Sequence, residues 1–350
     1  MSTEQHRSVQ TYSLLIIALI MSASALYWLK PVLIPLILSL MLSMGLSPFV
    51  RWLERVARLP SWAAVSVSLC LSLFIVIGFS ILVGDSLKTA MAQTGEFESR
   101  LHGVYEMILS KLQASGVEID RASVSSQLQS LPVGRTFGNM VSGLLNMVSD
   151  SFLILFFLVY LLQGTTEGQD SADSADSADS ADSVASTIRT RVRKYLSIKL
   201  SLSLLTGGLV WFALMLFGVP MAAMFGVLTV VLNFIPSVGS IVATLLPMPF
   251  ILLNPDLSGG VVLAILIITG TVQMVIGNIL EPKLLGDSLE LHPITILVTL
   301  VFWGMLWGVP GMFLATPLTA VVCILMNAYA PTRPFAQVLS GRRSEVTQAP

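Results

Sequence analysis

Long apolar runs alternate with short polar connections, and most charged residues lie in those connections. The runs at 11–29, 31–50, 61–84 and 140–163 each approach the roughly 20 residues that a helix needs to cross a bilayer. After residue 195 the apolar segments become shorter, and Pro, Gly and Asn interrupt them. They are 196–217, 222–235, 238–253, 259–279, 294–307 and 312–329. This pattern predicts an all-α, polytopic integral membrane protein whose C-terminal half contains broken or re-entrant helices.

The polar connections divide the chain into six expected parts. These are transmembrane helices 1–3 in 1–84, a small extracytoplasmic helical insert in 85–139, transmembrane helix 4 in 140–163, a cytoplasmic linker in 164–194, the C-terminal transmembrane transport region in 195–330, and a cytoplasmic tail in 331–350. Ten crossings result if every short segment spans the membrane. Six result if 222–253 and 294–329 are both re-entrant, and the sequence leaves the two counts open.

Basic residues set the expected orientation. The loop 51–60 holds Arg51, Arg55 and Arg58 against a single acid, and four more basic residues lie within 189–194. Cytoplasmic loops carry an excess of Lys and Arg, so both regions are expected in the cytoplasm. The same rule places the N- and C-termini there.

Two polar regions have separate interpretations. In 85–139, apolar residues spaced as on one helical face favour a small helical cap over a substrate-binding domain, because about 55 residues make a poor independent core. The repeat DSADSADSADSAD at 170–182 resembles calcium-binding repeats in its spacing. It lacks their glycines and interleaved ligands, so a solvated acidic linker is the better interpretation.

Composition excludes several classes of protein. Hydrophobic residues make up 54% of the chain and charged residues only 11%, against about 25% charged residues in soluble domains. A net charge of −1 without a basic stripe argues against a nucleic-acid partner. The Cys and His residues form no metal-ligand spacing, and no catalytic or nucleotide-binding pattern is visible. We therefore expect no enzyme activity, no metal and no cofactor, and any transport should be secondary.

Three separated motifs carry a family resemblance. They are NFIPSVGS at 233–240, GNILEPKLLGDSLELHP at 277–293 and FWGMLWGVPGMFLATPLTAVV at 302–322. In this order they resemble the autoinducer-2 exporter (AI-2E) family of bacterial inner-membrane permeases, including its quorum-sensing signal transport branch. The resemblance implies export of a small polar solute, most notably autoinducer-2, across the bacterial inner membrane. Glu290 departs from the family pattern, and some relatives are associated with sodium/proton exchange instead.

Glu281 is the first candidate site residue, because an ionisable side chain at membrane depth is expensive to bury. Pro282 follows it and biases it away from helix, so the span is expected to stop there. Carbonyls freed near Asn278, together with the Glu281 carboxylate, would then hold a cation, a proton or a hydroxyl-rich solute. The alternative is an interfacial pair between Glu281 and Lys283 or an arginine.

The second candidate is the break at Asn233, Pro236 and Gly239. The proline is expected to free the carbonyl near Leu232, and broken helices facing each other recur at transporter binding sites. A purely structural hairpin tip is the alternative. Gln273 is expected to add either a contact to the solute or a helix–helix hydrogen bond.

Three functions are compatible with these residues. The first is a homo-oligomeric secondary transporter. Apolar residues at heptad-like spacing from Leu314 to Leu325 in the last helix would suit self-association. The second is a sodium/proton antiporter that uses Glu281, and the third is a membrane scaffold. The expected partners are the lipid bilayer and a small polar solute or cation.

Overall fold

The computed structural model describes residues 3–92, 151, 153–162, 180–252, 254, 257–285 and 291–341. All regular elements within these residues are helices, which confirms the predicted all-α membrane fold. Most of the expected insert, the first part of the fourth span, most of the Asp repeat and Glu290 lie outside the described residues.

The first two apolar runs form a bent pair. Helix α1 (Thr3–Trp28) and helix α2 (Lys30–Val56) meet at Leu29, where the chain turns by 80°. Their apolar parts are long enough to cross a membrane only when taken together, whereas the sequence predicted two separate spans. Pro31 explains the break, because it has no N–H to continue the hydrogen bonding of α1.

Helix α3 (Ser61–Ala92) is longer than the predicted third span and includes the first eight residues of the expected insert. Its connection to α2 is only Ala57–Pro60, so most of the predicted loop 51–60 is helical. The start of α3 and the end of α2 pack with the helical segment Leu153–Leu162 in a small apolar core.

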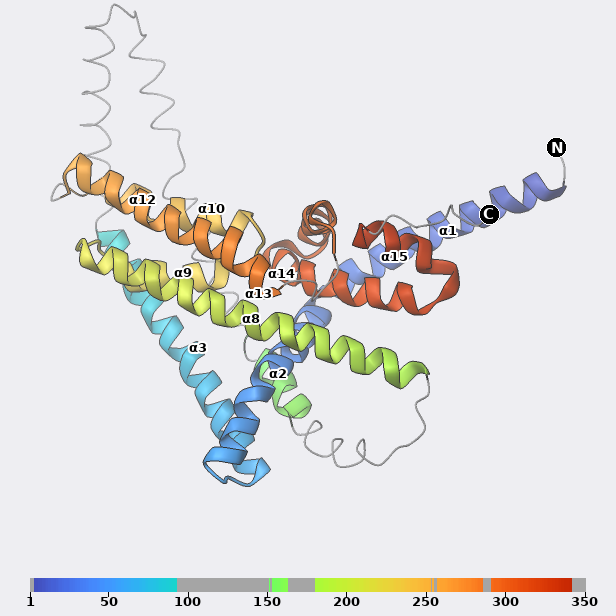
Figure 1. The fold of residues 1–350 in the computed structure, drawn as a ribbon, viewed down its shortest axis with the longest axis horizontal. Helices are drawn as coiled ribbons and strands as arrows, with labels where there is room; N and C mark the ends of the chain where they lie inside the picture. The colour runs from blue at the N-terminus through green and yellow to red at the C-terminus, as the bar shows by residue number, and fades with distance from the viewer. Residues whose placement is uncertain are drawn as a thin grey trace, which may run out of the picture.

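Helix α8 (Ser180–Leu216) is the longest described element and lies at the centre of the molecule (Figure 1). It begins at Ser180, although the sequence predicted a linker up to residue 194. The reason is an apolar stripe that continues upstream of Tyr195. This stripe consists of Val184, Ile188, Val192 and Tyr195, which are buried or half-buried.

Helices α9 (Ala222–Leu232), α10 (Val238–Leu245) and α11 (Met248–Leu252) are each too short to cross a bilayer, as predicted. A Cβ on Gly239 would overlap the Leu232 carbonyl, so only glycine fits where α10 turns against α9. The Leu232 carbonyl accepts a hydrogen bond from the Ile235 N–H at 2.9 Å. The prediction of a free carbonyl there is therefore wrong, because the turn closes on itself.

Helix α12 (Gly259–Val275) continues through a π-helical turn, η1 (Ile276–Leu280), into α13 (Glu281–Leu285). The predicted stop at Glu281 is wrong: its backbone is helical, and its N–H donates to the Ile276 carbonyl five residues earlier. Proline crowds the carbonyl four residues before it, and the wider π turn relieves this crowding just ahead of Pro282.

Helix α14 (Pro293–Ala328) breaks at Gly308, which has φ 67° and ψ −143°. Trp303 Nε1 donates to Thr319 Oγ1 at 3.3 Å, a contact between residues 16 apart that a straight helix would forbid. The two arms therefore fold back on each other, which confirms the predicted break at 308–311. After a 3₁₀ turn, η2 (Ala330–Thr332), helix α15 (Arg333–Ser340) returns to the start of α14, where the Leu339 carbonyl accepts from the His292 N–H.

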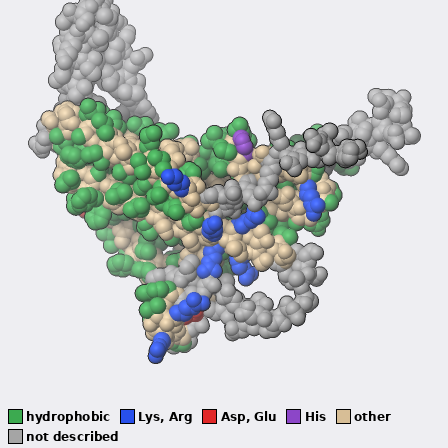
Figure 2. Space-filling model, in the orientation of Figure 1, with side chains coloured by type: hydrophobic (Ala, Val, Ile, Leu, Met, Phe, Trp, Pro, Cys, Tyr) green, Lys and Arg blue, Asp and Glu red, His purple; other side chains and the backbone are tan. Residues whose placement is uncertain are grey.

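By length and composition, four described stretches can cross a membrane, and the bent α1–α2 pair makes a fifth if it is one span. They are Ala63–Ser86, Ser183–Leu216, Gly259–Leu285 and Pro293–Ala328. The last of these contains the Gly308 break. Hydrophobic side chains cover the surface around α9 and α12, whereas Lys and Arg gather towards the α2–α3 connection and the centre of the view (Figure 2).

Candidate functional site

The candidate site is a polar layer on the buried face of α8, between two apolar cores. The second half of α8 contributes Val210 and Leu214 to a core shared with α9, α11 and α12. Its first half contributes Val192 and Leu196 to a core shared with α2 and α14. Between these cores the same face of α8 buries polar side chains. These are Lys199, Ser203 and Thr206.

Lys199 and Glu281 form an ion pair in this layer. Lys199 Nζ lies 2.5 Å from Glu281 Oε1, and the two residues are 82 positions apart in the chain. The Lys199 side chain is 2% exposed and that of Glu281 is 18% exposed. Within the described residues, Glu281 thus pairs with a lysine from the middle of α8 and not with Lys283 or an arginine, the alternative that the sequence left open. The ion pair ties α13 to α8.

Tyr195 lies one turn before Lys199 on α8 and is also buried. Its hydroxyl faces the Glu281 carboxylate and the hydroxyl of Thr316 from the second arm of α14. The Thr316 hydroxyl is buried and makes no hydrogen bond of good geometry with a described residue. Helices α13 and α14 therefore bring a carboxylate and a hydroxyl group to the buried Tyr195 of α8.

Asn233 joins the layer from the end of α9. It is 3% exposed, and its Nδ2 donates to Ser203 Oγ at 3.3 Å. Ser203 follows Lys199 by four residues, so the two stand on successive turns of α8, about 6 Å apart along the axis. The structure thus brings Asn233 and Glu281, two predicted site residues from separate motifs, to adjacent turns of one helix face.

The other predicted site residues have different positions. Gln273 is buried on α12, and its Nε2 has no hydrogen-bond partner among the described residues. Pro236 and Gly239 build the turn between α9 and α10 and contribute no polar side chain. Asn278 and Pro282 are exposed, so neither belongs to the buried layer. The buried layer therefore contains Asn233 and Glu281 of the predicted residues, while Pro236 and Gly239 shape the turn beside Asn233.

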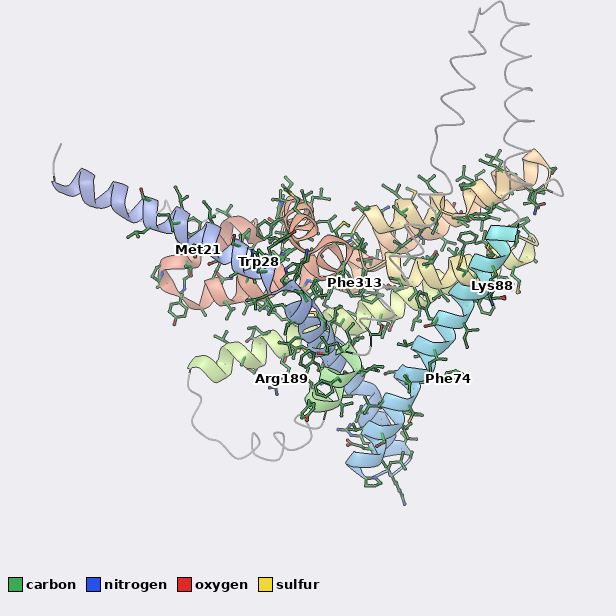
Figure 3. The ribbon with its side chains drawn as sticks, turned by 180° about the vertical axis from the view of Figure 1, so that it is seen from behind. Met21, Trp28, Phe74, Lys88, Arg189 and Phe313 are labelled. Carbon is green, nitrogen blue, oxygen red and sulfur yellow. The ribbon has the colours of Figure 1, made fainter. Side chains whose placement is uncertain are left out.

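The helix breaks converge beside this layer. Phe234, in the α9–α10 turn, stacks on Phe313, which follows the α14 break, with ring centroids 4.4 Å apart; Figure 3 labels Phe313 near the centre of the molecule. Trp307 Nε1 donates to the Leu26 carbonyl at 3.0 Å, close to the α1–α2 bend. Trp303 and Trp307 are both buried, so neither faces lipid. Three breaks in different helices thus meet around one core.

The chemistry of this arrangement is polar recognition. It offers a carboxylate, an ammonium group, hydroxyls and the amide of Asn233 within a low-dielectric surrounding, where such groups interact strongly. Within the described ranges, no three His, Cys, Asp or Glu side chains lie together as metal ligands would.

Sequence reasoning missed Lys199 and Tyr195. The signal was present: Tyr195, Lys199 and Ser203 recur every four residues, which places them on one helical face. Lys199 also stands well inside an apolar run, where an ionisable residue is a functional candidate by default.

Comparison with known proteins agrees with this architecture. The profile of the AI-2E family transporter matches residues 16–331. A Borreliella burgdorferi protein named "Putative transport protein" is 29% identical over 309 residues, covering 88% of this chain and 84% of its own length. The Escherichia coli K12 AI-2 transport protein TqsA is 26% identical over 318 residues, covering 90% of this chain and 91% of its own. E. coli YhhT is 40% identical over 136 residues, 39% of this chain and 38% of its own. Since the profile spans nearly the whole chain, the protein belongs to the AI-2E family of membrane transporters.

Proposed function

We propose that this chain is a secondary transporter that exports a small polar solute, and that the solute is autoinducer-2. The observation that carries the proposal is the buried polar layer on α8, at which Asn233 and Glu281 arrive from two broken or distorted helices. Buried polar groups in a membrane protein are costly, and in transporters they mark the solute path. The similarity to TqsA along nearly its whole length supports autoinducer-2 as the solute.

The proposed location is the bacterial inner membrane, with both termini in the cytoplasm. Arg55 and Arg58 near the α2–α3 connection, and Arg189 near the start of α8, support this orientation through the positive-inside rule. Figure 3 labels Arg189 on the first half of α8. Export then carries the solute from the side of these arginines to the opposite side.

The test measures how autoinducer-2 divides between cells and medium. A deletion strain should retain more of the signal inside the cells, and the wild-type gene should restore its release. Glu281→Gln should lower release, because it leaves the Lys199 ammonium buried without a counter-ion. Lys283→Gln is the matched control, since Lys283 is exposed on the same short helix.

Unchanged partition in the deletion strain would refute autoinducer-2 as the solute. Sodium/proton exchange in membrane vesicles is the assay for the alternative function, which Glu281→Gln should abolish if Glu281 carries the exchanged ion. Indifference of every transport readout to Glu281→Gln would favour a scaffold.

A further inference from the structure

We propose that Lys199 determines the substrate class of the site by acting as a built-in counter-ion for Glu281. A buried carboxylate facing a solute path would attract small cations. The Lys199 ammonium group already takes the place of such a cation. The ion pair is therefore electrically neutral, and the site accepts an uncharged, hydroxyl-bearing solute. This inference rests on the proposed transport function and sharpens it.

The burial of the two partners supports this assignment. Lys199 is 2% exposed, whereas Glu281 is 18% exposed, so an incoming solute meets the carboxylate while the ammonium group lies behind it. The 2.5 Å contact leaves no room for a cation between them. A small cation would have to approach the outer side of Glu281, with Lys199 close beneath.

Electrostatics then disfavours cation binding. At an effective dielectric of 20, the interaction between two unit charges 4 Å apart changes a binding affinity by about three orders of magnitude. A second cation on the outer side of Glu281 lies farther from Lys199 than from the carboxylate, so its repulsion from Lys199 offsets roughly half of its attraction to Glu281. Removing the ammonium group should restore this half, which corresponds to at least about one order of magnitude in affinity.

The groups around the pair fit a neutral polar solute. Tyr195 lies close to Glu281, with Thr316 beside its hydroxyl, and Ser203 follows one turn further along α8, where it accepts from Asn233 of α9. In the described part of the chain, the buried polar atoms without a hydrogen-bond partner include Gln273 Nε2 on α12. Buried polar atoms are normally satisfied, so this amide is available to donate to a hydroxyl or carbonyl oxygen of a solute.

The experiment uses the purified full-length protein in detergent and sodium as the probe. The thermal unfolding midpoint is measured in sodium chloride and in choline chloride at equal ionic strength. Wild type should show no sodium-specific shift. Lys199→Met, which keeps an unbranched side chain one atom shorter and removes the charge, should bind sodium at least about tenfold more tightly and so gain stability as sodium rises.

Two control variants isolate the charge. Lys199→Arg keeps the cation and should behave like wild type towards sodium. The double variant K199M/E281Q removes both charges and should lose the sodium response. A sodium-specific shift in wild type overturns the proposal, even if Lys199→Met does not fold. An equal response of Lys199→Met and the double variant also overturns it, because the carboxylate would then not be the binding group.

The export assay separates this inference from the proposed function. If autoinducer-2 is not exported while sodium binding follows the expected order, the solute assignment fails and the role of Lys199 stands. If autoinducer-2 is exported and wild type binds sodium, the role of Lys199 fails and the export function stands.

Discussion

Helices α3 and α8 are both long and apolar, yet their polar side chains have different hydrogen-bond partners. Within the described structure, 6% of the residues in the most apolar stretch of α3 are buried, against 44% in that of α8. On α3, the hydroxyls of Ser68, Ser72 and Ser80 each donate to a carbonyl four residues earlier in the same helix. On α8, Ser203 accepts from Asn233 and Lys199 pairs with Glu281.

The contrast shows how a membrane helix can carry polar residues for two purposes. A long apolar helix that packs little against the rest of the described chain, such as α3 with its exposed Phe74 (Figure 3), satisfies hydroxyls within its own backbone and remains apolar to its surroundings. Helix α8 satisfies Thr206 in the same way, through the Leu202 carbonyl, but it presents Lys199 and Ser203 to other helices. Polarity on α8 therefore marks an assembled site, whereas the serines of α3 leave its outer surface unchanged.

The largest expected effect comes from removing one charge of the ion pair between Lys199 on α8 and Glu281 on α13. Lys199→Met should destabilise the protein by up to about 3–5 kcal/mol, because it leaves the half-buried Glu281 carboxylate without its partner. The double variant K199M/E281Q should recover most of this loss, and the measurement is denaturant unfolding in detergent. Lys283→Met, at an exposed position, should change little. A double variant as unstable as the sum of the two single variants would contradict the pairing.

A smaller effect is expected at the turn that places Asn233. Gly239→Ala should cost about 1–3 kcal/mol, because the added Cβ meets the Leu232 carbonyl and the turn must shift. Gly260→Ala at the start of α12 has no such contact and should be neutral or stabilise the helix by a few tenths of a kcal/mol. Thermal unfolding of both variants checks the prediction, and equal effects would disprove it.

The smallest effect compares serines on the two helices. Ser203→Ala removes the acceptor of Asn233 and should cost about 0.6 kcal/mol, at most about 1.7. Ser72→Ala on α3 should cost less, since its hydroxyl bonds only its own helix. Export assays should separate them more clearly than stability does, with a loss for Ser203→Ala alone. Equal loss of export in both variants would remove the distinction between the helices.

Much of the fold follows from patterns that are local in the sequence. Long apolar runs, the short segments after residue 195 and the break at Gly308 were all predictable from length, Gly and Pro. The α1–α2 bend and the early start of α8 were missed. The first depends on how a helix responds to Pro31, and the second on an apolar stripe hidden among the charges before Tyr195.

The candidate site was predictable only in part. Glu281 and Asn233 stood out because each interrupts an apolar segment. Their partners, Lys199 and Ser203, come from another helix, and pairing between distant segments leaves no local pattern. The basic residues before Tyr195 indicate a membrane boundary by themselves, and nothing local distinguishes Lys199 as the partner of a distant carboxylate.

The π turn at Ile276–Leu280 changes the direction of the Glu281 side chain relative to that of Gln273. Eight residues of regular α-helix would rotate Glu281 by about 80° relative to Gln273. The extra residue held in one π turn subtracts about 100°, which leaves the two side chains only about 20° apart. The turn thus acts as a one-residue insertion that the helix has absorbed. Deleting one residue from this turn should still direct Glu281 towards Lys199, but Pro282 would again crowd the carbonyl four residues before it and kink the helix.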